Sequence, residues 1–220
     1  DAPGVLEGLV RAGVNVVRLN FSHGTPEHHA ERVAAVRRAA AAQGREVGIL
    51  ADLQGPKIRI EKFEEGKVLL SAGQEFTLVC RADAPEGDNH QVGVSYLGLV
   101  HDVHAGDTLL LDDGLMAVEV LAIEGERIRT RVLTDGVLSN RKGLNRLGGG
   151  LSLGALTDQD KQHITIAAGL GVDFIAVSFC RNAEDMNEAR RIAQSHGCDA
   201  ALVSKIERTE AIENLAEIID

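Results

Sequence analysis

The feature that most constrains the fold is an alternation of β-branched apolar runs with helix-forming segments, broken once by a long β-rich stretch. Four apolar runs predict strands, at residues 14–22, 46–53, 172–179 and 199–205. Helix-like segments fill residues 25–44, 157–169, 182–197 and 208–220, and we expect Thr25, Thr157 with Asp160, and Asn182 to cap the first three of them. Strands that alternate with helices form parallel sheets with right-handed crossovers, so the outer parts of the chain predict an α/β domain.

The middle of the chain has a different pattern. Short apolar runs such as KVLLS, EFTLVC and MAVEVL are separated by Gly-Asp, Asp-Gly and Glu-Gly-Glu turns. This pattern is typical of an antiparallel β module, either a small barrel or a sandwich. We therefore predict an α/β barrel domain over residues 1–57, an inserted β lid domain over 58–147, and the barrel domain again over 148–220. A β module that hangs from one strand–helix loop is suited to act as a lid.

The length of the α/β part limits the choice of fold. Removing about 90 inserted residues leaves about 130, which suffices for four strand–helix units, whereas a TIM barrel has eight units and typically ~250 residues. Four strands alone would expose unpaired backbone at both edges. We expect part of a TIM barrel, and an open four-stranded sheet is the alternative.

Composition excludes several classes of function. The 220 residues carry 33 acidic and 23 basic side chains, a net charge of −10, which disfavours a nucleic-acid surface or a polybasic membrane patch. Three widely spaced cysteines indicate neither a disulfide framework nor a zinc ribbon. No apolar run approaches the ~18 residues of a membrane helix. We expect a cytoplasmic protein that contacts no membrane and no nucleic acid.

Polar side chains gather where the predicted strands end. They are Arg18, Asn20 and Ser22 on the first strand, Asp52 on the second, Ser178 on the third, and Lys205 and Glu207 on the fourth. Alternate residues of a strand share one face, and the carboxyl ends of barrel strands form the active face. One polar strand end would be ordinary, but four in succession predict a shared site.

These residue types suit phosphate chemistry. Arginine binds phosphate oxygens through forked hydrogen bonds, as Arg18 and Arg59 could. Lys205 is a point charge able to follow a moving phosphoryl group, and Glu207 is a hard oxygen ligand of the kind Mg²⁺ takes beside substrate phosphates. Positioning and charge neutralisation are most of what phosphoryl transfer requires. Neither a Walker A motif nor GxGxxG is present, so scattered side chains and the lid would hold any nucleotide.

The motifs RLNFSHGT (18–25), ADLQGPKIR (51–59), DDGL (112–115), RKGLN (141–145) and VSKIE (203–207) resemble the pyruvate kinase family, in order and spacing. The resemblance covers essentially the whole chain. It implies a TIM barrel with a β lid after the third strand, the first strand upstream of Asp1 and strands six to eight beyond Asp220. The implied reaction transfers phosphate from phosphoenolpyruvate to ADP, giving pyruvate and ATP in glycolysis.

The resemblance also implies roles for single residues. Arg18 would bind the substrate phosphate, Lys205 would stabilise the transferring phosphoryl group, and Glu207 would bind Mg²⁺ or Mn²⁺. The nucleotide side would comprise Asn20, His23, Arg59 and Lys142. Ser178 and Phe179 would line the substrate pocket. A K⁺ site would comprise Asn20, Ser22, Asp52 and the Leu53 carbonyl.

One departure from the family motif concerns this K⁺ site. Many members read DTKGPEIR, whereas this chain reads DLQGPKIR, with Lys57 at the glutamate position. At ~4 Å and an effective dielectric constant of ~20, one unit charge is worth about 4 kcal/mol. We hypothesise that the Lys57 ammonium supplies the charge of K⁺ and makes the bound cation dispensable. A surface lysine beside Arg59 is the alternative.

Two other functional classes remain possible from the residues alone. A Mg²⁺-dependent barrel lyase acting on a pyruvate enolate would use Lys205 and Glu207, and a non-catalytic regulatory barrel would need neither. The family implies a homotetramer at full length and a second Mg²⁺ aspartate downstream, so we expect residues 1–220 alone to be inactive. His28 and His29 are interpreted as the solvated start of a helix.

Overall fold

The computed structural model describes residues 4–220, which form two compact units. Among the described residues, unit 1 comprises 4–56 and 154–220, and unit 2 comprises 57–153. Residues 148–153 therefore belong to unit 2, where Leu151 and Leu153 pack against its core, although we expected the barrel domain to resume at 148. Each unit is described by itself.

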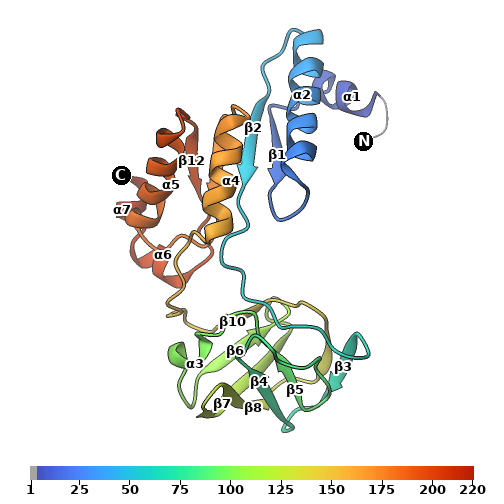
Figure 1. Cartoon of the computed structure of the whole chain (residues 1–220), viewed down its shortest axis with the longest axis vertical. Coiled ribbons are helices and arrows are strands. Elements are labelled where there is room, and N and C mark those ends of the chain that lie inside the picture. Colours follow the sequence, from blue (N-terminus) through green and yellow to red (C-terminus); the bar gives the residue numbers. More distant parts are fainter. Residues whose placement is uncertain (1–3) are drawn as a thin grey trace. The chain divides into compact units, whose positions relative to one another are not determined.

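Unit 1 is built on a parallel sheet (Figure 1). Its four strands lie in the order β1-β2-β11-β12, with bounds Val16–Asn20, Gly48–Asp52, Phe174–Val177 and Ala201–Ser204. All three strand pairs are parallel, and the register places Asn20 opposite Asp52 and Asp52 opposite Ala176. The carboxyl ends of the four strands therefore lie along one edge, as the sequence pattern predicted.

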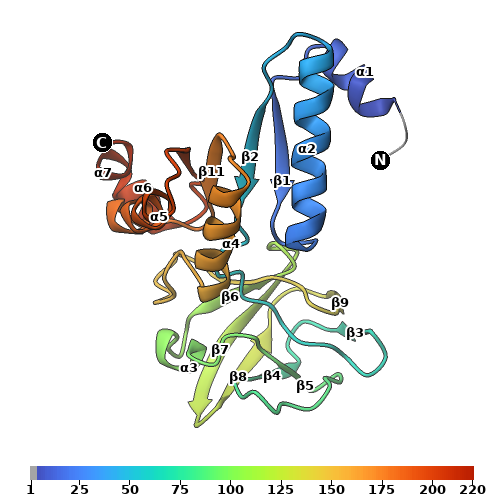
Figure 2. The ribbon, with the colours of Figure 1, turned by 45° about the horizontal axis from the view of Figure 1, so that its top comes forward.

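Three of the helices of unit 1 begin at the predicted capping residues. The helices of the unit are α1 (Val5–Arg11), α2 (Pro26–Ala42), α4 (Asp158–Gly169), α5 (Ala183–Ser195), α6 (Thr209–Glu213) and α7 (Leu215–Ile219). The side chains of Thr25 and Asn182 accept hydrogen bonds from the first turns of α2 and α5, and Thr157 and Asp160 form a capping box at α4. The single helix expected at 208–220 is two short helices that meet at Asn214. Figure 2 shows the same ribbon turned forward.

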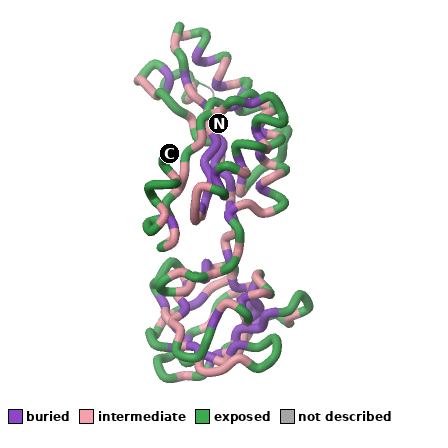
Figure 3. The backbone as a smooth tube through the Cα atoms, turned by 90° about the vertical axis from the view of Figure 1, so that its left-hand side faces the viewer, coloured by how far each residue is buried: buried purple, intermediate pink, exposed green. Residues whose placement is uncertain are grey.

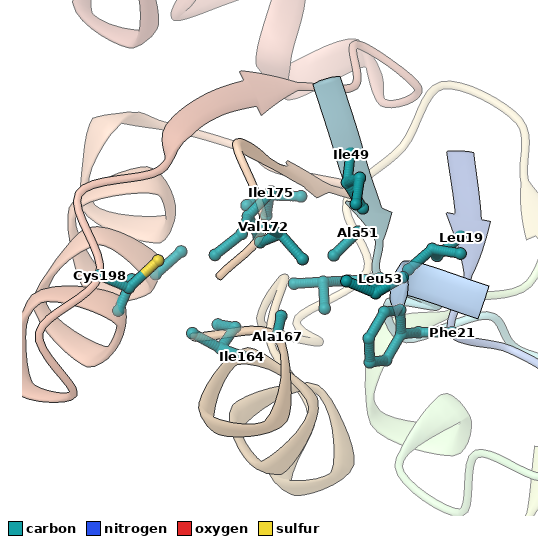
Figure 4. Close-up of a cluster of buried hydrophobic side chains, with 14 of the residues drawn as sticks. Leu19, Phe21, Ile49, Ala51, Leu53, Ile164, Ala167, Val172, Ile175 and Cys198 are labelled. Carbon is teal, nitrogen blue, oxygen red and sulfur yellow. The ribbon is translucent and has the colours of Figure 1, made fainter. Parts of the chain in front are cut away.

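One face of the sheet is buried under helices. Ile49 and Ala51 on β2 join Ile164 and Ala167 on α4 in one apolar cluster, which Figure 4 shows in close-up. Because strand side chains alternate, the residues between them point to the other face of the sheet. That other face carries Arg18, Asn20 and Asp52 in register, and the candidate site is built on it.

Unit 2 is mostly antiparallel. Its sheets are ordered β10-β6-β7-β8-β4-β5 and β3-β9. The bounds are β3 Lys67–Leu70, β4 Glu75–Val79, β5 Gln91–Gly93, β6 Thr108–Leu111, β7 Met116–Glu124, β8 Arg127–Val132, β9 Gly136–Ser139 and β10 Leu144–Arg146, with a short helix α3 at Leu99–Asp102. Among the named strand pairs of unit 2, only β4–β5 is parallel.

Each unit has its own hydrophobic core. Unit 2 buries Phe76, Leu78, Ile128 and Leu138 completely, and Figure 3 shows buried stretches in purple within each unit. The three cysteines are buried free thiols. No helix within residues 4–220 is long and apolar enough to cross a membrane.

Candidate active site

A buried carboxylate organises the carboxyl edge of the unit 1 sheet. Asp52 ends β2, and its side chain is 6% exposed. Arg18 Nε donates to Oδ2 of Asp52 at 2.5 Å, and Lys205 Nζ donates to Oδ1 at 3.2 Å. Burying a carboxylate this deeply is costly unless it is paired and hydrogen-bonded in this way. The structure thus brings together three predicted site residues from β1, β2 and the end of β12.

Ser178 connects this cluster to the backbone of the second strand. It follows β11 and is 1% exposed. Its hydroxyl donates to the Leu53 carbonyl at 2.6 Å and lies 2.7 Å from Lys205 Nζ, which donates to it. Ser178 was expected to line the substrate pocket; in the structure its hydroxyl is directed at Leu53 and Lys205.

Glu207 and Phe179 lie beside the Lys205 ammonium. Oε1 of Glu207 is 3.4 Å from Lys205 Nζ, and Oε2 accepts the backbone N–H of Phe179 at 3.2 Å. Phe179 has a φ of +57°, in the left-handed region that non-glycine residues rarely adopt. Residues in such conformations cost free energy and cluster at functional sites. The Glu207 side chain is 35% exposed, so it remains accessible to a ligand.

The loop after β1 carries three further predicted residues. Oδ1 of Asn20 accepts the backbone N–H of Ser22 at 3.0 Å, and the Asn20 carbonyl accepts that of His23 at 3.3 Å. The side chain of His23 is exposed, whereas Ser22 is half-buried. These bonds fold the loop tightly above the end of β1, next to Arg18.

The interpretation of a solvated helix start holds for His28, which is exposed, but it was wrong for His29. His29 is 3% exposed and stacks on Phe21, with ring centroids 4.2 Å apart. His163 on α4 contacts Phe21 edge-on at 5.2 Å. Burial lowers the pKa of His29 and of His163, because desolvation disfavours the charged ring. The start of α2 packs toward α4 through the ring of Phe21. The local sequence could not indicate this contact.

Asp160 is a neighbour of the candidate site. Its place in the sequence indicated only a role at the start of a helix. Asp160 is fully buried, and its Oδ2 accepts from Thr157 as the capping box predicts. Its Oδ1 accepts the backbone N–H of Gly55 at 3.1 Å. The same carboxylate therefore caps α4 and holds the turn that follows Asp52. The capping-box pattern was the only available signal, and it does not reveal the long-range bond.

Unit 2 gathers a second group of charged residues. Lys142 Nζ lies 2.8 Å from Oδ1 of Asp112, and Lys57 Nζ lies 3.8 Å from Oδ1 of Asp113. Asp112 and Asp113 both have positive φ, at 51° and 54°. The ion pair found for Lys57 is thus with a loop carboxylate of unit 2.

Arg59 lies close to that group in unit 2. Its backbone pairs with Gly143, directly after Lys142, and its Nη1 donates to the Arg141 carbonyl at 2.8 Å. The predicted nucleotide-side residues therefore divide between the units. Asn20 and His23 belong to unit 1, and Arg59 and Lys142 belong to unit 2.

A divalent cation fits this site if Glu207 is one member of a larger set of ligands. Mg²⁺ usually takes one or two carboxylates together with substrate phosphates and water. Glu207 offers a partly exposed carboxylate at the strand ends. Within residues 4–220 no group of three or more His, Cys, Asp or Glu could hold a metal ion. Glu207 is the partly exposed carboxylate of unit 1 that would contribute to such an ion.

The candidate K⁺ ligands are already engaged by protein donors. Both oxygens of Asp52 accept from cationic side chains, and the Leu53 carbonyl accepts from Ser178. The Asn20 amide oxygen accepts from Ser22. A monovalent cation would have to share these oxygens with the groups that now contact them.

Two cations and one accessible carboxylate at one sheet edge can hold a phosphate and a metal ion together. Arg18 is 59% exposed and Lys205 is 32% exposed at the side chain, so both can reach a ligand while Asp52 holds them. Preorganised charges of this kind stabilise negative charge that develops during a reaction.

Known proteins match the chain along its length. The family described as "Pyruvate kinase, barrel domain" matches residues 1–220. "Pyruvate kinase II" of Salmonella typhimurium is 53% identical over 212 residues, 96% of this chain and 44% of the relative. "Pyruvate kinase" of Haemophilus influenzae is 49% identical over 214 residues, and that of Bacillus licheniformis is 40% identical over 218, covering 45% and 37% of those relatives. The chain spans less than half the length of these relatives.

Proposed function

Because the chain belongs to the pyruvate kinase family, we propose that the full-length protein carrying it transfers the phosphoryl group of phosphoenolpyruvate to ADP. The products are pyruvate and ATP. The observation that carries the proposal is the Lys205 ammonium, held at the sheet edge between Asp52 and Glu207 beside Arg18. We further propose a cytoplasmic protein that works in glycolysis.

The roles proposed for the residues of unit 1 follow from their charges and exposure. The Arg18 guanidinium binds the phosphate of the substrate, since its Nη atoms are left for a ligand while Nε contacts Asp52. Lys205 offers its charge to the phosphoryl group as that group moves. Phe179, fixed beside Glu207 by its backbone, forms a wall of the substrate pocket. Asn20 and His23 are proposed to lie on the side of the site where the nucleotide binds.

Arg59 and Lys142 of unit 2 are proposed as the lid residues that contact the nucleotide phosphates. Lys142 is paired with Asp112, and Arg59 is fastened through its backbone and Nη1. An ammonium held by a single carboxylate can exchange that partner for a phosphate. This assignment rests on the family motif RKGLN and on the positive charge of both side chains.

Glu207 is the residue that would hold Mg²⁺ or Mn²⁺, together with a second carboxylate from the remainder of the protein. A bound divalent cation neutralises phosphate charge. Because the family implies a second Mg²⁺ carboxylate outside residues 1–220, we propose that these residues alone do not catalyse the reaction. A homotetramer, the usual assembly in this family, is proposed for the full-length protein.

The function is tested by assaying the full-length protein for pyruvate formation from phosphoenolpyruvate. We expect formation that requires both ADP and a divalent cation. Pyruvate formed from another substrate without ADP would instead support a metal-dependent lyase. Binding of phosphoenolpyruvate without turnover would support a regulatory barrel. Either result would contradict the proposal.

We propose that activity does not require K⁺. The full-length protein should keep its kcat within about twofold when tetramethylammonium replaces every K⁺, Na⁺ and ammonium ion. Lys57→Glu should create a K⁺ requirement, with activity falling at least about tenfold without K⁺, because a unit charge that replaces K⁺ at ~4 Å would be worth about 4 kcal/mol. The lysine at position 57 and the protein donors that already engage Asp52 and Leu53 support this expectation.

A matched control separates this effect from a general change of charge. Lys67→Glu makes the same charge change at an exposed position of unit 2 and should leave the protein independent of K⁺. A parent protein that loses activity without K⁺ would show that Lys57 is an ordinary surface lysine.

A further inference from the structure

We propose that Ser178 is a positioning residue that sets the place of the Lys205 ammonium for phosphoryl transfer. The inference rests on the proposed function and deepens it, because it assigns the buried hydroxyl a role in aiming the catalytic lysine. Ser178 is 1% exposed, so it acts on a substrate through Lys205.

The direction of both hydrogen bonds at Ser178 is fixed by chemistry. The Leu53 carbonyl can only accept, and the Lys205 ammonium can only donate. The hydroxyl must therefore donate its proton to Leu53, at 2.6 Å, and turn a lone pair toward Lys205, at 2.7 Å. The hydrogen bond to Leu53 fixes the orientation of the Ser178 hydroxyl, so that its oxygen can accept the hydrogen bond from Lys205.

Ser178 is the only uncharged partner found for this ammonium in the described part of the chain. The three protons of Lys205 face Ser178 Oγ at 2.7 Å, Asp52 Oδ1 at 3.2 Å and Glu207 Oε1 at 3.4 Å. The contact with Ser178 is the shortest of the three. Without it, the two carboxylates alone would determine the position of the ammonium and draw it toward themselves.

The backbone around Ser178 has little freedom to adapt. A Cβ added at Gly55 would lie 2.8 Å from Ser178 Cβ, so the turn after β2 packs directly against this serine. Gly55 is itself held by Asp160. The following residue, Phe179, occupies the left-handed region. Ser178 is therefore held in one position, and its hydroxyl can orient the flexible side chain of Lys205.

A double-mutant cycle in the full-length protein tests this role. Ser178→Ala should lower kcat about 10–100-fold with KM for phosphoenolpyruvate changed less than about threefold, since misplacing a catalytic group by ~1 Å can cost about 10²-fold. In a Lys205→Met background the same change should lower kcat less than about twofold, because the ammonium that Ser178 positions is absent. Equal losses in both backgrounds would show a merely structural role and overturn the inference.

Two further variants control for folding. Ser178→Cys keeps the side-chain shape with weaker hydrogen bonds and should give an intermediate kcat; a kcat equal to that of the parent would count against the inference. Thr130→Val removes a comparable buried hydroxyl, which donates to the Phe76 carbonyl at 2.7 Å in unit 2. It should lower the melting temperature and leave kcat unchanged.

A crystal structure of the Ser178→Ala protein separates this inference from the proposed function. Lys205 Nζ should move by about 0.5 Å toward Asp52 and Glu207, from 3.2 Å and 3.4 Å to the ~2.8 Å of a charge-assisted hydrogen bond, whether or not the parent makes pyruvate. An unmoved ammonium would overturn the positioning role. An inactive parent with a displaced ammonium would overturn only the proposed reaction.

Discussion

Lys205→Met should lower kcat for pyruvate formation by the full-length protein about 10³-fold or more, in the range seen when a charge that stabilises transferring phosphate is removed. The methionine keeps the length and the apolar stem of the lysine but loses the ammonium. KM for phosphoenolpyruvate should change far less than kcat, because the charge acts most strongly on the transferring group. Steady-state kinetics measure both quantities.

The matched control is Lys161→Met on α4. Lys161 pairs with Glu188 at 2.8 Å on the surface, where both side chains are well exposed. Such a pair contributes about 0–1 kcal/mol to stability, so kcat should stay at the parental value. A Lys205→Met protein that retained a tenth or more of the parental kcat would contradict the role assigned to this lysine.

Gly55→Ala should destabilise the full-length protein by about 2–5 kcal/mol. Gly55 has a φ of +69°, where a side chain costs about 1–2 kcal/mol. The added Cβ would also lie 2.8 Å from Ser178 and 2.9 Å from Phe179, and overpacking of this kind costs about 1–3 kcal/mol. Denaturant unfolding measures the change, and kcat should fall as well because Ser178 is displaced.

Gly44→Ala separates the two contributions. Gly44, just after α2, has a φ of +60°, and an added Cβ would meet no atom within 4 Å. This variant should lose only about 1–2 kcal/mol from its backbone conformation and keep its kcat. If both variants lost the same free energy of unfolding, the contact of Gly55 with Ser178 would have no energetic role.

Local sequence patterns predicted most of the secondary structure. The α2, α4 and α5 helices begin at Thr25, Thr157 and Asn182 because side-chain caps act within one turn of the chain. The family match over residues 1–220 confirms part of a TIM barrel with a β lid over the alternative of a free-standing open sheet. The break at Asn214 was missed, because no Gly or Pro marks it.

Burial and long-range bonds were the less predictable part. His29 has the polarity of a surface residue, yet it is buried against Phe21, since α4 covers that face of the helix start. Asp160 was visible only as a capping residue, and its bond to Gly55 joins positions 105 residues apart. Neither contact produces a periodic pattern in the sequence from which it could be predicted.

The sequence by itself determined which chemical groups the strands carry to their carboxyl ends, because alternation along a strand and capping at a helix are local. The tertiary structure alone decided how those groups contact one another. Asp52 gained Arg18 through the parallel register of β1 with β2, and Lys205 reached Asp52 and Ser178 through the register of β2, β11 and β12. The bonds from Lys205 to Asp52 and from Ser178 to Leu53 join residues 153 and 125 positions apart, and they depend on packing of the whole core.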